Sequence, residues 1–442
     1  MSRSTRSSLK VLRPFVLIAI AGLAISGCSS SQASSTAPGR LDSSFGSGGK
    51  AVTDLGSPAD VANAIAVQSD GKLVLAGSTR DANQGDNFAV VRYTPDGQLD
   101  SAFGDGGKVT TDFGGKADVA AAVAVAPDGK IVTVGTSHGT ATGDNIAIAR
   151  YTTDGKLDSG FGTGGQISQD LGTKADHGNG VAIQPDGRII VVGSTQDPSQ
   201  GDNFAVLRYT TDGKLDPAFG VGGKVSTDFG GKSDIAKAVA VQSDGKIVVV
   251  GTSHGTATGD NIAIARYTAD GKLDSGFGVA GQISEDLGTK ADHGNGVAVQ
   301  SDGRIIVVGS TQDPAQGANF AVLRYTTDGK LDSAFGNGGK VTTDFGGKDD
   351  TAMSAVLQED GKIVVAGTSH GTGTGDNIAV ARYNPDGQPD SGFGSGGQVS
   401  TDLGTQADHG NGVVLQNGKI VVGGSSKDPK SGDNFVAVRY TA

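Results

Sequence analysis

The chain has 442 residues, a formal net charge of −11, a single cysteine and no tryptophan. The acidic balance and the lack of any Lys/Arg cluster beyond the N-terminal segment argue against a nucleic-acid groove. One cysteine excludes an internal disulfide framework and a cysteine-based zinc site. Glycine is abundant at 74 residues while proline stays at 12, which favours turns between ordered strands over disorder.

Residues 1–27 have the features of a secretory leader. Four basic residues and no acidic one precede the apolar run at residues 15–25, which is too short to span a membrane as a mature helix. The run leads into Ile-Ser-Gly-Cys at residues 25–28, which resembles the lipobox of bacterial lipoproteins. This resemblance implies that Cys28 carries lipid and anchors the protein to the membrane. An ordinary cleaved signal peptide with an incidental cysteine is the alternative.

Lipidation would place the protein in the bacterial cell envelope, outside the cytoplasm, at the outer membrane or the cell surface. Acyl chains add about 0.8 kcal/mol of membrane affinity per buried CH₂ group. Residues 28–40 are small, polar and rich in serine, so we expect a flexible tether between the anchor and the folded part.

A 58-residue repeat fills the rest of the chain, residues 41–442. Its seven copies begin at residues 41, 99, 157, 215, 273, 331 and 389. Such a period indicates one supersecondary unit copied in tandem. Each copy contains four strand candidates, which in the second copy are Lys108–Thr111, Ala121–Val125, Lys130–Gly135 and Asn145–Tyr151. Asp-Gly pairs at 128–129 and 154–155 are hairpin and turn signals.

These features predict an all-β fold, a seven-bladed β-propeller of four-stranded antiparallel blades. A linear β-solenoid is the alternative. The last copy stops after Tyr440, where the other copies continue into a turn, and the folded part opens with the strand that would follow that turn. We therefore expect residues 41–55 to complete the last blade and close the ring. If blades instead coincide with the copies, closure rests on packing alone.

Each copy carries LDxxFGxxG, then AxAVQxDGKIVVxG, then DNFAVxRYxxDG, with small variations. This pattern resembles the delta-60 repeat of bacterial surface proteins over residues 41–442. The resemblance implies a propeller-like fold in a secreted or surface protein and attaches no general activity to it. The strand order also looks like that of NHL-repeat propellers.

Two charged positions recur in every copy. An arginine lies in the third strand candidate and an aspartate ends the outer one. The arginines are Arg92, Arg150, Arg208, Arg266, Arg324, Arg382 and Arg439. The aspartates are Asp54, Asp112, Asp170, Asp228, Asp286, Asp344 and Asp402. A buried arginine needs a carboxylate or carbonyl partner, so we expect these two series to form structural ion pairs between strands or blades.

All six histidines fall in two kinds of loop that the predicted frame brings to one rim. They form three candidate pairs across blade junctions: His138 with His177, His254 with His293, and His370 with His409. Asp176, Asp292 and Asp408 lie next to the second member of each pair. Two histidines and a carboxylate are a ligand set for Zn²⁺, and oxygen ligands alone suit Ca²⁺. Asp and Asn also bond the local backbone in turns, and this structural interpretation is the alternative.

The sequence shows no catalytic motif in its proper context, and all aromatic residues beyond the leader occupy repeat positions. We therefore expect a monomeric binding or scaffolding module for an unidentified protein or envelope partner, with no cofactor. A cation-binding surface protein and a purely structural coat are alternatives. A propeller enzyme would require one blade to break the symmetry near the axis. The copies look too alike for that, and departures such as Ala318, Pro389 and Asn417 look like drift or turn adjustment.

Overall fold

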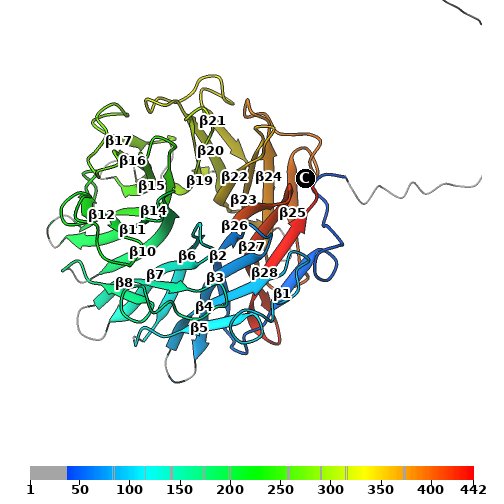
Figure 1. Ribbon diagram of the computed structural model, residues 1–442. Helices are drawn as coiled ribbons and strands as arrows, with labels where there is room; N and C mark the ends of the chain where they lie inside the picture. The colour runs from blue at the N-terminus through cyan, green and yellow to red at the C-terminus, as the bar shows by residue number, and fades with distance from the viewer. Residues whose placement is uncertain are drawn as a thin grey trace, which may run out of the picture. The chain divides into compact units, whose positions relative to one another are not determined.

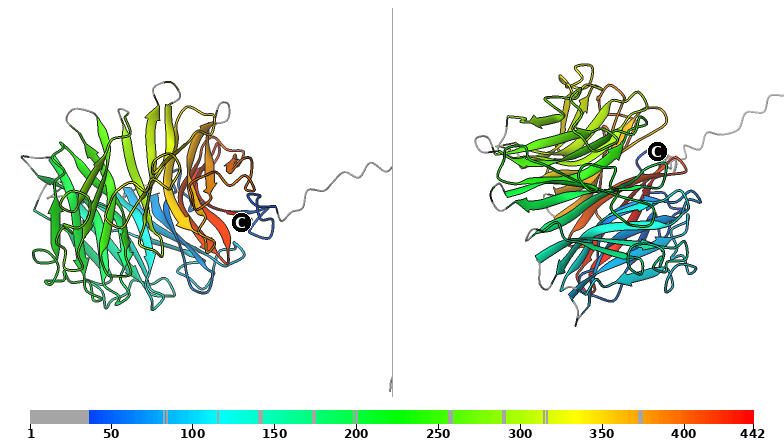
Figure 2. Two further views of the ribbon diagram at one scale, coloured as in Figure 1. Left: turned by 90° about the horizontal axis from the view of Figure 1, so that it is seen from above. Right: turned by 60° about the vertical axis from the view of Figure 1, so that its left-hand side comes forward.

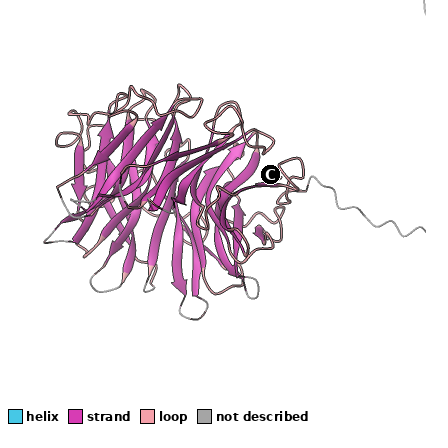
Figure 3. Ribbon diagram, turned by 90° about the horizontal axis from the view of Figure 1, so that it is seen from below, coloured by secondary structure: helices cyan, strands magenta, loops and turns pink. Residues whose placement is uncertain are grey.

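The computed structural model describes residues 37–442 apart from residues 82, 84, 115, 140–142, 173–174, 198, 200, 256–258, 289–290, 314, 316 and 372–374. In this part of the chain every regular element is a β-strand (Figure 3). The strands form seven four-stranded antiparallel sheets arranged around an axis (Figure 1). The fold is therefore the predicted seven-bladed β-propeller.

The four strands of a blade are named here by their place between the axis and the circumference. The inner strands are β2 (Val61–Val67), β6 (Asp118–Val125), β10 (Asp176–Ile183), β14 (Asp234–Val241), β18 (Asp292–Val299), β22 (Asp350–Leu357) and β26 (Asp408–Gln416). The second strands are β3 (Leu73–Asp81), β7 (Ile131–Gly139), β11 (Ile189–Asp197), β15 (Ile247–His254), β19 (Ile305–Asp313), β23 (Ile363–Gly371) and β27 (Lys419–Asp428).

The third strands are β4 (Gly85–Tyr93), β8 (Gly143–Tyr151), β12 (Gly201–Tyr209), β16 (Asp260–Tyr267), β20 (Gly317–Tyr325), β24 (Gly375–Tyr383) and β28 (Gly432–Tyr440). The outer strands are β5 (Lys108–Thr111), β9 (Gln166–Gln169), β13 (Lys224–Thr227), β17 (Gln282–Glu285), β21 (Lys340–Thr343), β25 (Gln398–Thr401) and β1 (Lys50–Thr53). Blades are numbered 1 to 7 in chain order, beginning with the β2–β5 blade.

The ring is closed by strand β1, as the sequence predicted. Its sheet has the order β1-β28-β27-β26, so the first strand of the chain is the outer strand of blade 7. Lys50 pairs with Val438 and Thr53 with Phe435 in antiparallel register. This pairing covers the edge of β28, which would otherwise present unpaired backbone groups to solvent.

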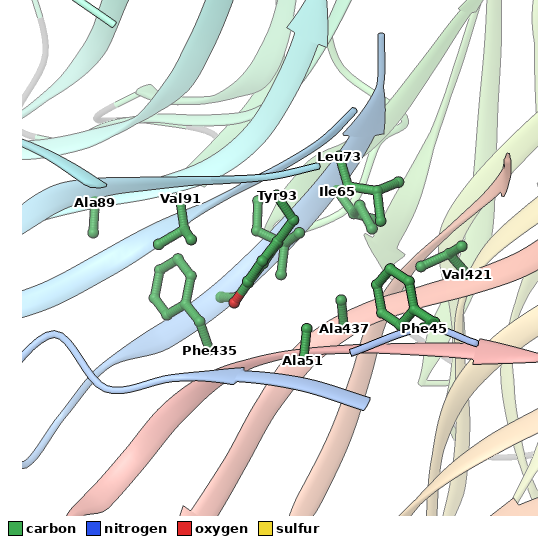
Figure 4. Close-up of a cluster of buried hydrophobic side chains, with 12 residues drawn as sticks. Phe45, Ala51, Ile65, Leu73, Ala89, Val91, Tyr93, Val421, Phe435 and Ala437 are labelled. Carbon is green, nitrogen blue, oxygen red and sulfur yellow. The ribbon is translucent and has the colours of Figure 1, made fainter. Parts of the chain in front are cut away.

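The junction of blades 7 and 1 has a continuous apolar core (Figure 4). Ala51 of β1 and Phe435 of β28 pack there with Ile65, Leu73 and Val91 of blade 1. Apolar clusters of the same kind fill the other six junctions, because both faces of each sheet carry apolar side chains. The stability of the ring therefore comes largely from packing between blades.

Local turn chemistry sets the register within the blades. In blade 7 the hairpin between β26 and β27 is one residue shorter than elsewhere and contains Asn417 and Gly418, with φ of 50° and 80°. Gln416 still pairs with Lys419, so the register is kept. Asn-Gly adopts such left-handed angles readily.

Gly155 is required for a different reason, because a Cβ there would lie 2.6 Å from the backbone nitrogen of Gly104 in the neighbouring blade.

Loops extend from both ends of the ring (Figure 2). The upper rim is defined here as the end that carries the connections between second and third strands and the segments that enter each inner strand. A bridge between Asp144 of blade 2 and Ala175, which enters blade 3, shows that both kinds of loop meet there, as predicted. The lower rim carries the Asp-Gly hairpins and the LDxxFG loops.

Residues of the predicted tether also contact the ring. Gly39 donates its backbone N–H to Thr441, and Gly394 of blade 6 donates to the carbonyl of Pro38. The described chain is therefore attached to blades 6 and 7 from residue 38 onward.

Candidate functional site

The predicted histidine pairs do meet on the upper rim, with a carboxylate between them. His138 near the end of β7 lies opposite Asp144 at the start of β8, and its Nδ1 contacts the Asp144 Oδ1. Nδ1 of His177, on β10 of the next blade, lies 3.7 Å from the other carboxylate oxygen. The local cause is the bridge from Asp144 to Ala175, which brings His177 across the junction.

The same arrangement occurs at alternate junctions. His254, Asp260 and His293 form the second group, and His370, Asp376 and His409 form the third. Nδ1 of His293 and of His409 lies 3.8 and 3.6 Å from the shared carboxylate. We call these three groups the His-Asp-His clusters. Their six imidazole side chains remain between 37% and 57% exposed, so solvent reaches every cluster.

The junction between blades 5 and 6 explains the alanine that interrupts the Asp-Asn series. Ala318 stands where the other blades have an aspartate, and its backbone N–H donates to the Asp349 Oδ1 at 3.0 Å. Asp349 occupies a position that is alanine or serine in the other copies. At this junction the carboxylate therefore lies on the other blade. The loss of the aspartate at position 318 is compensated by Asp349, so Ala318 is not a product of drift.

The three aspartates predicted as ligands lie elsewhere. Asp176, Asp292 and Asp408 are buried at the start of their inner strands. Asp176 accepts a 2.7 Å hydrogen bond from the backbone of Leu171 and a 2.6 Å bond from the Thr195 hydroxyl. The prediction that they join the histidines is corrected, since the shared carboxylate is Asp144, Asp260 or Asp376. No group of three or more His, Cys, Asp or Glu side chains in the described ranges is placed to hold a metal ion.

The recurrent arginines do form structural ion pairs, but with another partner. Nε of Arg92 lies 2.8 Å from Oδ2 of Asp100, the aspartate of the LDxxFG motif, and its guanidinium stacks 4.4 Å from the Phe103 ring centre. Nη1 donates to the carbonyl of Thr153 in the next blade at 2.6 Å. Arg92 and Asp100 are both buried. Each lower-rim arginine thus binds the LDxxFG loop of its own blade. In most blades it also donates a hydrogen bond to the neighbouring blade, so that the two blades are linked.

The aspartates of the Asp54 series bond the local backbone instead. Asp54 accepts a 2.6 Å hydrogen bond from the backbone of Gly56, and the equivalents in the other copies, Asp112, Asp170, Asp228, Asp286, Asp344 and Asp402, do the same. Their predicted pairing with the arginines was wrong. The sequence did contain the correct signal, because an aspartate follows the arginine by eight residues in the first six copies.

Lys237 was overlooked by the sequence analysis. It lies on inner strand β14 at a β-bulge between Ala236 and Ala238. Its side chain is exposed, although its strand is one of the seven nearest the axis. Although this side chain reaches solvent, the protein atoms that surround it in the ring partly desolvate the ammonium and lower the pKa of Lys237 below its ordinary value. One blade therefore does place a unique base near the axis, contrary to the expectation that no copy breaks the symmetry there.

Taken together, the fold and these contacts define a seven-bladed β-propeller with a structural lower rim and a polar, accessible upper rim. Six stretches match the family described as "Domain of unknown function (DUF5122) beta-propeller": residues 68–103, 126–161, 184–219, 242–277, 300–335 and 358–393. Each runs from the end of an inner strand to the Phe of the LDxxFG motif. The seventh such stretch is divided between the two ends of the described chain by ring closure.

Several solved structures are similar to this chain at low sequence identity. A catalytically inactive virginiamycin B lyase from Staphylococcus aureus with quinupristin is 13% identical, with a TM-score of 0.52, over 88% of this chain and 98% of that one. A streptogramin B lyase is 15% identical, with a TM-score of 0.50, over 88% and 97%. The periplasmic gluconolactonase PpgL of Pseudomonas aeruginosa is 16% identical, with a TM-score of 0.47, over 83% and 95%. No curated protein matches the sequence.

The predicted lipidation site, Cys28, lies outside the described residues. Among the residues that are described, no helix has the length and apolar character needed to cross a membrane.

Proposed function

We propose that this protein is a lipid-anchored binding module of the bacterial cell envelope and that its upper rim is the binding surface. The observation that carries the proposal is the set of three His-Asp-His clusters at alternate blade junctions. The fold does not demand them, because the first junction places Arg80 and Asp86 at the same positions. By contrast, the lower-rim arginine pairs with an aspartate and stacks on a phenylalanine in all seven blades, and this network is accounted for by ring assembly.

Three equal clusters on one rim favour a partner that offers the same group several times, such as an envelope polymer or an oligomeric protein. Simultaneous contacts raise the overall affinity without requiring any single strong one. The exposed imidazoles can donate or accept hydrogen bonds according to their protonation state. No catalytic step is part of the proposal.

The rim can be tested with residues 37–442 immobilised and exposed to envelope extract. The triple variant His138→Ala/His254→Ala/His370→Ala removes one histidine from each cluster. The matched control Lys156→Ala/Lys214→Ala/Lys272→Ala changes three lower-rim side chains that are 80% to 81% exposed. We expect a component that the wild type and the control retain and the histidine variant releases. Equal retention by all three proteins, or none by the wild type, would refute rim binding.

The anchor is tested separately on the full chain in a bacterial host. Cys28→Ser removes the only thiol. We expect the wild type in the membrane fraction and the variant in the soluble extracytoplasmic fraction. Identical fractionation of the two proteins would end the lipoprotein proposal and leave the rim proposal untouched.

A further inference from the structure

The inner strands provide one equivalent position per blade at the level of Lys237. These seven positions are Asn63, Ala121, Asn179, Lys237, Asn295, Met353 and Asn411. A register shift brackets this position in every blade. The four asparagines share a structural task, since each donates its side-chain amide to a backbone carbonyl of the next blade. Asn179, for example, donates to Ala236 at 2.8 Å.

The three positions without asparagine carry alanine, lysine and methionine. The bulge therefore requires neither a charge nor a long side chain, and Lys237 is not explained by the fold. On the seven inner strands, all of which are described, the aspartates are buried at the strand starts and Lys237 is the one exposed lysine, arginine, aspartate or glutamate.

The surroundings of Lys237 leave its charge without a counter-ion. Its ammonium forms no salt bridge or hydrogen bond with any described side chain, and partial desolvation by the surrounding ring lowers its pKa. Asp234 begins the same strand, but its carboxylate is buried and accepts a hydrogen bond from the backbone of Phe229. Confining a cation without a partner is unfavourable, and an anion at the same place would relieve that cost.

The flanking strands add groups that suit an anion. β14 lies between β10 and β18, whose His177 and His293 occupy positions two residues nearer the upper rim than Asn179 and Asn295. The charged groups that face these histidines are Asp144 and Asp260, one against each imidazole. Both histidines therefore lie on the upper-rim side of the level of Lys237, on the two strands that flank β14.

We propose that Lys237 is the anchor of an axial binding site for the anionic group, carboxylate or phosphate, of a ligand that enters from the upper rim. This site goes beyond the proposed rim function, because it lies on a single blade and does not depend on the threefold repetition of the His-Asp-His clusters.

The test measures how fast the Lys237 amine is acylated by a water-soluble reagent at pH 8, with the modified residue identified by peptide mass mapping. The probes are sodium acetate and sodium phosphate, each compared with sodium chloride at equal ionic strength. Lys156, on the exposed lower rim, is the internal control. At a probe concentration ten times the dissociation constant, labelling of Lys237 falls about tenfold while labelling of Lys156 does not change.

The two probes distinguish a carboxylate ligand from a phosphate ligand. The proposal is overturned if neither probe slows labelling of Lys237, if both lysines are slowed equally, or if Lys237 is not labelled at all. Two variants give an independent readout through the anion-induced rise in Tm. Lys237→Met, which introduces the residue found at the equivalent position 353, abolishes the rise, and Lys237→Arg keeps it. An unchanged rise in Lys237→Met would also refute the site.

Discussion

Nη1 of Arg439 donates a 2.7 Å hydrogen bond to the backbone carbonyl of Pro95, 344 residues earlier in the chain. The same guanidinium lies 2.8 Å from the carboxylate of Asp42 and stacks 4.6 Å from the ring centre of Phe45. Through these contacts the last strand holds both the N-terminal segment and blade 1. The ring is therefore closed by a buried charge pair as well as by strand β1.

Replacing this arginine should weaken closure strongly. Arg439→Leu leaves the buried carboxylate of Asp42 with Lys419 as its one cationic partner among the described residues, and we expect a loss of about 3 kcal/mol in the free energy of unfolding, measured by urea denaturation. Arg80→Leu is the control, because the Arg80–Asp86 pair is exposed and should cost less than about 1 kcal/mol. Equal losses of unfolding free energy in the two variants would show that the Arg439–Asp42 pair contributes no more to stability than an exposed pair.

One buried carboxylate should oppose folding at neutral pH. Burial raises the pKa of Asp350 to about 6, and the nearby charges of Asp344 and Asp349 add to the increase. Among the described residues its Oδ1 has no hydrogen-bond partner. The folded-state pKa of Asp350 exceeds the unfolded value of 3.8. Its contribution to the free energy of unfolding is therefore fully present below about pH 4 and is lost as the pH rises through about 6.

Asp350→Asn should therefore stabilise the protein by about 2 kcal/mol at pH 7 and gain little at pH 4, as measured by thermal unfolding across this range. Asp292→Asn is the matched control. Asp292 accepts hydrogen bonds from Leu287 and Thr311, so the same change should destabilise there. A pH-independent effect at Asp350 would contradict the assigned pKa.

A single alanine carries backbone strain that glycine would remove. Ala280 has a φ of 52°, whereas the other copies have glycine at this position. Ala280→Gly should stabilise the protein by about 1 kcal/mol, since the left-handed region is unfavourable for a residue with a Cβ. Gly338→Ala makes the reverse change at an equivalent position where a Cβ meets no atom within 4 Å, so it should destabilise by a similar amount. Calorimetric Tm values that move in the same direction would disprove the assignment to strain.

The His-Asp-His clusters should behave as imidazole–carboxylate contacts rather than metal chelates. The two imidazoles of each cluster lie against different oxygens of one carboxylate, and no metal-holding group is found in the described parts of the rim. We expect calorimetric titration of the dialysed protein with Zn²⁺ or Ca²⁺ to give no saturable heat. Saturable Zn²⁺ binding that disappears in His138→Ala/His254→Ala/His370→Ala would show that the side chains rearrange into a metal site.

The sequence by itself determined the architecture of this protein. A strict period, Asp-Gly turns and two apolar faces per sheet favoured a closed ring over a linear solenoid, and the repeat frame predicted the strand that closes it. These features are local or repeated, so they can be recognised without coordinates. The three histidine pairs could be predicted in the same way. The number of residues between the two histidines of a pair corresponds to one hairpin plus the connection to the next blade.

Only the tertiary structure decided which charged groups meet within and between blades. The partner of Arg92 is Asp100 because the LDxxFG loop folds back under the third strand, and Asp144 lies between His138 and His177 because its strand bridges the next blade. Lys237 lies on an inner strand, at a bulge that no sequence pattern marked. Such contacts depend on the angle and spacing at which whole sheets pack, and these are properties of the assembled ring rather than of any one repeat.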